Sequence, residues 1–285
     1  MMKRICYCQL ILGGVAVITF VSAPSLAGQR GSARSQEEVA RDLRSYDRDV
    51  VARALDHVPL AYDPYDELGW RFPPSYVVTP GLSAALISAL DREAKLHMDG
   101  CTVTGTGGRH PELALDLLHY VIALRDSAAI PALVQMICSG GGVRQALMNL
   151  GPEIIPHVVE WAGSPKATWA DITSSLRALS EAVVRWGETL SVDARASIRN
   201  VALQHLEHRG PATKRFANTW EGGFVIDQAI TLASVIRAPD LLEVLADIAE
   251  GGHEALDGMD SAAAAGLRDM ARRGLADSLL RIEHR

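Results

Sequence analysis

Between residues 61 and 80 the chain gathers aromatic rings and carboxylates, the side chains best suited to recognising a partner. The candidates are Tyr62, Asp63, Tyr65, Asp66 and Trp70. Aromatic rings offer a large contact area at small entropic cost, and the acids could select a basic or hydroxyl-rich partner. The pattern therefore predicts a binding surface for a peptide or a sugar that includes these five residues.

Other groups could in principle hold an ion or a phosphate, but each has a simpler interpretation. The acidic segment lacks the ordered alternation of an EF-hand calcium loop. His205 and His208 are three residues apart on a predicted helix, a spacing that could bind a metal, but a solvated basic helix end is the favoured interpretation. The glycines of residues 105–108 are not followed by the Lys-Ser/Thr of a P-loop. We predict no catalytic residue, no metal and no cofactor.

The elements that position these side chains are predicted to be helices. Apolar residues recur at three- and four-residue spacing, which is typical of amphipathic helices. The predicted helices cover residues 36–58, 82–97, two segments within 111–138 joined at 125–127, 169–186, 191–208, 224–236, 241–249, 261–270 and 275–282. Four prolines exclude a helix from residues 61–80, where residues 76–78 could form one short strand.

A two-helix pattern recurs along the chain. In each copy a helix ends on Leu, a short turn follows, and an Ile-Pro pair opens the next helix, as in "LRDSAAIPAL" and "NLGPEIIPHV". These segments resemble HEAT-type repeats. The matching residues are Asp126, Ala129, Ile130, Pro131, Leu133, Val143, Arg144, Ala146, Leu147, Leu150, Gly151, Ile155 and Pro156.

The resemblance implies a HEAT-like α-solenoid of about a dozen helices in one domain, residues 36–285, with an irregular insertion near residues 61–80. Repeats of this kind stack into a curved array that holds a partner on one face, and they share no catalytic residue. Leu133 and Leu147 are expected to be buried. The aromatic rings of the insertion would then either bind a partner or cap the first exposed hairpin of the array.

The first 27 residues are typical of a secretory signal peptide. Lys3 and Arg4 precede an uncharged apolar run, and Ser25 and Ala27 provide small residues before a cleavage site. An uncleaved membrane anchor and a buried helix are the alternatives. Cleavage after Ala27 would leave a flexible leader, residues 28–35, and an exported protein, periplasmic or secreted, without stable membrane insertion.

The net charge limits the classes of partner, and the cysteine content limits the possible disulfides. Without residues 1–27 the chain has 26 Lys and Arg against 34 Asp and Glu, a net charge of −8. This balance argues against nucleic acid and against anionic lipid. The mature chain keeps Cys101 and Cys138, which either form a disulfide in an oxidising compartment or are separate buried thiols.

The sequence therefore predicts an exported, non-enzymatic HEAT-like binding or scaffold protein that interacts with a protein or peptide. One alternative is an envelope or secreted enzyme whose helical scaffold forms a cleft near residues 61–80. A purely structural subunit of a larger envelope assembly is the third possibility.

Overall fold

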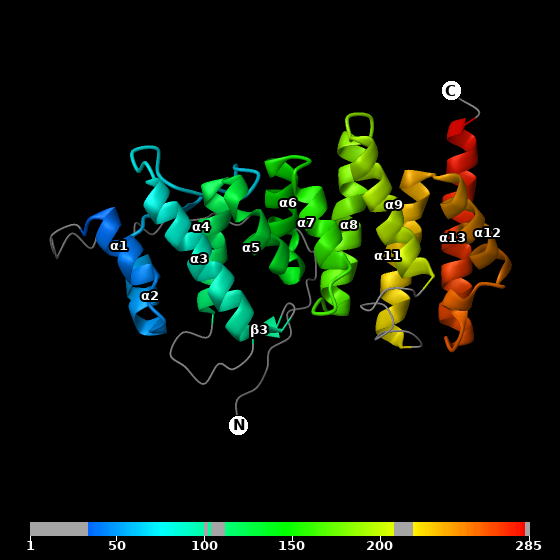
Figure 1. The fold of residues 1–285 in the computed structure, drawn as a ribbon, viewed down its shortest axis with the longest axis horizontal. Helices are drawn as coiled ribbons and strands as arrows, with labels where there is room; N and C mark the ends of the chain where they lie inside the picture. The colour runs from blue at the N-terminus through cyan, green and yellow to red at the C-terminus, as the bar shows by residue number, and fades with distance from the viewer. Residues whose placement is uncertain (1–33, 100–101, 104–111, 208–218, 283–285) are drawn as a thin grey trace, which may run out of the picture. The chain divides into compact units, whose positions relative to one another are not determined.

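The computed structural model describes residues 34–99, 102–103, 112–207 and 219–282, and most of these residues are helical (Figure 1). The described α-helices are α1 (Gln36–Leu43), α2 (Arg48–Leu55), α3 (Pro80–His97), α4 (Leu113–Leu124), α5 (Ile130–Gln135), α6 (Gly141–Leu150), α7 (Ile154–Ala162), α8 (Trp169–Trp186), α9 (Val192–Leu206), α11 (Trp220–Ile236), α12 (Pro239–Glu250) and α13 (Ser261–Ile282). The predicted all-α fold of about a dozen helices is confirmed. The predicted signal peptide and nearly all of the leader lie outside the described residues.

Within residues 34–282 the helices pack mainly on near neighbours along the chain. Extensive contacts join α1 to α3, α3 to α4, α7 to α8, α8 to α11, and α11 and α12 to α13. Figure 1 shows the same order, with the colour changing steadily from the blue α1 and α2 to the red α13. Local packing of this kind is what a stack of helical hairpins requires.

Polar side chains fix the starts of several helices. Ser35 and Thr168 each form a reciprocal capping box, with Glu38 and Asp171 respectively. Ser191, the first residue of the predicted helix 191–208, caps α9 and accepts a hydrogen bond from the backbone N–H of Ala194. These bonds satisfy amides that have no partner within the helix.

Two arginines end helices in the left-handed conformation, at the turns where the repeat pattern predicted hairpins. Arg125 follows α4 with φ 53°, and Arg237 follows α11 with φ 58°. A non-glycine residue pays about 1–2 kcal/mol for this conformation, so the neighbouring helices must hold the turn in place.

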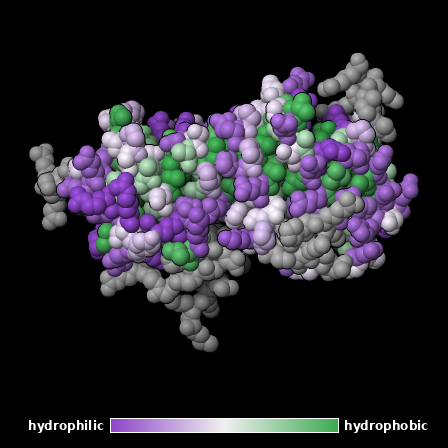
Figure 2. All heavy atoms as spheres, viewed as in Figure 1, coloured by the Kyte–Doolittle hydropathy of each residue, from purple (hydrophilic) through white to green (hydrophobic). Residues whose placement is uncertain are grey.

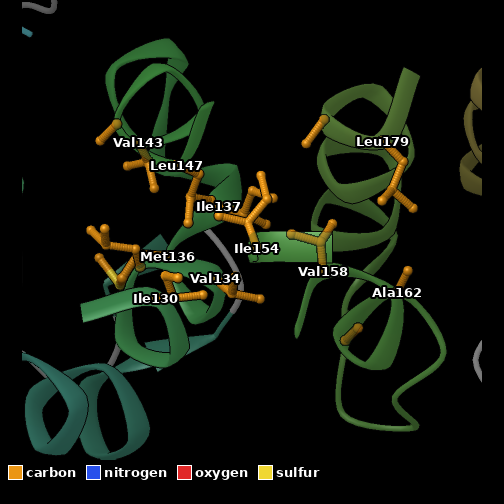
Figure 3. Packing of buried hydrophobic residues seen from close by; sticks show 14 of the residues in the cluster. Ile130, Val134, Met136, Ile137, Val143, Leu147, Ile154, Val158, Ala162 and Leu179 are labelled. Atoms are coloured by element: carbon orange, nitrogen blue, oxygen red, sulfur yellow. The ribbon is translucent and has the colours of Figure 1, made fainter. Parts of the chain in front are cut away.

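The core is a continuous apolar cluster that runs through the helices. Figure 3 shows side chains of α5, α6, α7 and α8 pointing toward one another, among them Val134, Leu147, Val158 and Leu179. Leu147 is completely buried and Leu133 is 1% exposed, so the predicted burial of both is confirmed.

Two helix predictions were wrong. The predicted first helix, residues 36–58, is two helices, because Asp47 caps α2 and leaves Tyr46 in the turn, 85% exposed. The two predicted helices at the C-terminal end are one helix, α13. Gly274, which lies in the gap between the two predicted helices, is inside α13, where a side chain would meet the Ser234 hydroxyl of α11.

The insertion is not helical, as predicted, but its strands lie elsewhere than expected. Residues 76–78 form no strand. Instead β1 (Ala61–Tyr62) pairs antiparallel with β2 (Trp70–Arg71), and a second short pair joins β3 (Met98–Asp99) to β4 (Thr102–Val103). No helix in the described part of the chain is both long enough and apolar enough to cross a bilayer.

Candidate functional site

The candidate site begins with the loop between β1 and β2, which is folded tightly on itself. The backbone N–H of Asp63 donates to the Gly69 carbonyl at 2.7 Å. The Asp63 carboxylate accepts from the Tyr65 amide at 3.0 Å, and the Asp66 carboxylate accepts from the Leu68 amide at 2.9 Å. Such side-chain-to-backbone bonds fix turns. Gly69 closes the loop with φ 74°, a conformation that suits glycine.

The aromatic residues of this loop divide into an anchor and exposed rings. Trp70 is half-buried, and its indole stacks on the His119 ring of α4 with 4.4 Å between ring centroids. Tyr62 packs edge-on against Trp70 at 5.2 Å but remains 63% exposed. Tyr65 is 96% exposed at the loop tip. The structure therefore brings Tyr62 and Trp70 together and leaves Tyr65 projecting into solvent.

Both predicted acids pair with arginines. Asp63 pairs with Arg71 at 2.8 Å, and Asp66 pairs with Arg125 of the α4 turn at 2.5 Å. The Leu68 amide, and then the Arg125 guanidinium, hold the pKa of Asp66 below its usual value. Asp63 and Asp66 therefore fix the loop to itself and to α4.

Glu67 joins the same loop to α6. Its carboxylate accepts hydrogen bonds from the side-chain amides of Gln145 and Asn149, the latter at 3.1 Å. Asn149 in turn accepts from Arg185 of α8 at 3.4 Å. A polar chain thus runs from the loop across α6 to α8, and no described cation forms an ion pair with Glu67.

Below this polar chain lies a hollow of about 260 Å³. Its lining residues are Leu68, Val121, Ile122, Arg125, Asp126, Leu133, Ala146, Asn149 and Leu150. Most of the lining is apolar, whereas Arg125, Asp126 and Asn149 provide polar groups. Because the hollow lies at the C-terminal ends of α4 and α6, it faces the partial negative charge of two helix ends.

Two residues of α4 have pKa values that are shifted by burial, His119 beneath the loop and Tyr120 against α2. The Tyr120 hydroxyl donates to the Leu55 carbonyl at 3.2 Å, and burial raises the pKa of this phenol. Burial also lowers the pKa of the His119 imidazole, while the charge of Asp116 partly opposes this effect. His119 is therefore mainly neutral near pH 7 beneath the Trp70 ring.

The remaining candidates from the sequence do not form a second site. His205 is completely buried inside the fold, so its interpretation as part of a solvated helix end was wrong. His208 and residues 105–108 lie outside the described residues. In the described part of the chain, no three His, Cys, Asp or Glu residues are arranged to hold a metal ion.

Cys138 forms a disulfide bond. The other three cysteines, Cys101 among them, lie outside the described residues. The pairing of Cys101 with Cys138 therefore stays a prediction.

Sequence reasoning missed the hollow, because its residues come from four separate segments. A second aromatic cluster, formed by the half-buried Trp169 and the exposed Trp220 and Phe224, was also missed. Trp169 begins α8, whereas Trp220 and Phe224 lie in the first turns of α11, so the cluster forms only where these two helices begin side by side.

Comparison of the chain with protein-family models, curated proteins and solved structures gave no match.

Proposed function

We propose that this chain is an exported, non-enzymatic binding or scaffold protein of the HEAT-like α-solenoid type, and that its loop of residues 61–71 contacts a protein or peptide partner. The observation that supports this most strongly is the 96% exposure of Tyr65 on a loop tied down on both sides. An exposed tyrosine on a rigid support loses little entropy on binding, which is the property of an interface hot spot.

Some side chains of the loop anchor it to the rest of the fold, and another is exposed and free to contact a partner. Leu68 is 8% exposed and Trp70 packs on His119, so these two side chains hold the loop against α4. The cap hypothesis therefore accounts well for Leu68 and Trp70. It does not account for Tyr65, because a ring that covers a hydrophobic end would itself be buried.

The contacts of the acids favour binding over catalysis. Acid–base chemistry by carboxylates requires groups that share a cleft and whose pKa values are pushed apart. Asp63 and Asp66 instead each pair with an arginine. Export and the solenoid arrangement are parts of the same proposal, supported by the signal-like residues 1–27 and by the near-neighbour packing of the helices.

The test is capture of a partner from the envelope fraction of the source cells by the mature protein, with Tyr65→Ala as the variant. Removal of a hot-spot ring should weaken capture by roughly tenfold or more, corresponding to more than about 1.4 kcal/mol. The melting temperature should change little. Tyr46→Ala is the matched control, because Tyr46 is 85% exposed on a different part of the chain. Equal capture by both variants would contradict the proposal.

A further inference from the structure

We infer that the hollow beneath the loop receives a lysine or arginine side chain of the partner. The inference rests on the proposed binding function and specifies the chemistry of the partner. It depends on the size of the hollow, the apolar character of its floor and the charges at its mouth.

Size and lining indicate a single extended side chain. A hollow of about 260 Å³ is smaller than the roughly 300–1,000 Å³ of sites that enclose whole small molecules. Its floor is formed by Leu68, Val121, Ile122 and Leu133, all of which are buried. The aliphatic stem of a lysine or arginine can pack on such a floor while its charged head stays near water.

The charges at the mouth favour a cation. The Arg125 guanidinium is already neutralised by Asp66. The Glu67 carboxylate accepts hydrogen bonds from the neutral amides of Gln145 and Asn149, and no Lys, Arg or His within the described ranges forms an ion pair with it.

Asp126 likewise accepts from neutral donors, the Ser83 hydroxyl and the Ala128 amide. The last turns of α4 and α6 add the partial negative charge of two helix C-termini. Arg185, which donates to Asn149, is a further cation in this region and offsets only part of this charge.

A basic side chain of the partner would therefore satisfy both parts of the hollow. Its stem would cover the apolar floor, and its head would lie near Glu67 and the C-terminal carbonyls of α4 and α6. An uncharged side chain would gain only the packing on the apolar floor. An acidic side chain would be repelled by the negative charge near Glu67.

The experiment uses three probe peptides, acetyl-Gly-Gly-X-Gly-Gly-amide, in which X is lysine, norleucine or glutamate. Each is titrated into the mature protein while methyl NMR signals of Ile122, Leu133 and Leu150 are followed. We expect saturable shifts at these methyls with lysine. Norleucine should bind about two- to fivefold more weakly, the effect of a partly exposed ion pair, and glutamate should not bind measurably.

Two charge-matched variants test the role of Glu67. Glu67→Gln should reduce lysine affinity to that of norleucine, and Glu188→Gln, the same change at an exposed acid, should leave it unchanged. A third variant, Ala146→Leu, fills the hollow and should remove the shifts with every probe, with the melting temperature reporting on folding.

Equal affinity for lysine and norleucine, or methyl signals that do not shift, would overturn the inference. Failure of this inference is distinguishable from failure of the proposed function. If capture depends on Tyr65 but persists in Ala146→Leu, the inferred site for a basic side chain is contradicted and the proposed function stands. Lysine-dependent shifts without Tyr65-dependent capture overturn the proposed use of the loop and leave the basic-side-chain site standing.

Discussion

Trp70 and His119 form the contact that fixes the loop to α4. The indole stacks on the imidazole with 4.4 Å between ring centroids and contributes to its burial. Burial disfavours the charged form, which explains the lowered pKa of His119. The stability of the loop is therefore linked to pH through His119.

We expect the contribution of His119 to stability to fall as the solution becomes acidic. Its pKa in the folded state is below the value of about 6.5 expected in the unfolded state, so the unfolded chain takes up the proton first. The contribution is complete above about pH 6.5 and is lost as the pH falls through the lower folded-state pKa.

The measurement is the free energy of unfolding in urea at pH 8 and pH 5 for wild type and His119→Phe. The phenylalanine keeps an aromatic ring against Trp70 but cannot take up a proton. Wild type should lose more stability than the variant between these values. Other histidines contribute to both proteins and cancel in the difference, so parallel losses would refute the role given to His119.

At the scale of elements, α13 packs against α11 through small residues. A side chain at Gly274 would overlap the Ser234 hydroxyl, which itself donates to the Ile230 carbonyl at 2.8 Å. The Ser278 hydroxyl lies at the same contact and donates to the Gly274 carbonyl at 2.7 Å. The two helices therefore approach more closely than larger residues would allow.

Gly274→Ala should lower the free energy of unfolding by about 1–3 kcal/mol, the usual cost of forcing extra atoms into a packed contact. Gly266→Ala in the same helix is the matched control, because nothing lies within 4 Å of the added carbon. That change should instead raise stability by about 0.5–1 kcal/mol, since alanine is the better helix former. Chemical denaturation of both variants gives the comparison, and destabilisation of equal size would contradict the packing argument.

For the molecule as a whole, hydrophilic and hydrophobic residues are interspersed over the face drawn in Figure 2. The net charge of −8 predicted after cleavage favours solubility and disfavours nonspecific binding to nucleic acid.

Export predicts a defined N-terminus. Mass spectrometry of the exported protein should find Gly28 as its first residue, because Ser25 and Ala27 satisfy the small-residue rule for cleavage. Full-length chain recovered from membranes would support the anchor alternative instead.

Export also predicts that the disulfide of Cys138 is formed with Cys101. Thiol counting of protein taken from its native compartment, under denaturing and non-reducing conditions, should find no free thiol in the mature chain. The bond should add about 2–4 kcal/mol to stability, since it closes a loop of moderate length. Two reactive thiols per mature chain would exclude the pairing.

The sequence by itself determined the helical class and most helix limits. Apolar spacing is a local property, so α8 and the cap of α9 at Ser191 could be predicted without knowledge of the tertiary structure. The absence of a helix from residues 61–80 could also be predicted, because the prolines in this segment are incompatible with a helix interior.

Only the tertiary structure decided what those residues do. Trp70 became an anchor because His119 of another element lies beneath it, and Asp66 became an ion-pair partner because Arg125 ends α4 beside the loop. Similarly, Gly274 became a close contact between α13 and α11 because Ser234 occupies the space where a side chain would lie. Each of these outcomes depends on a neighbour distant in sequence, and contacts of that kind leave no periodic signal in a single chain.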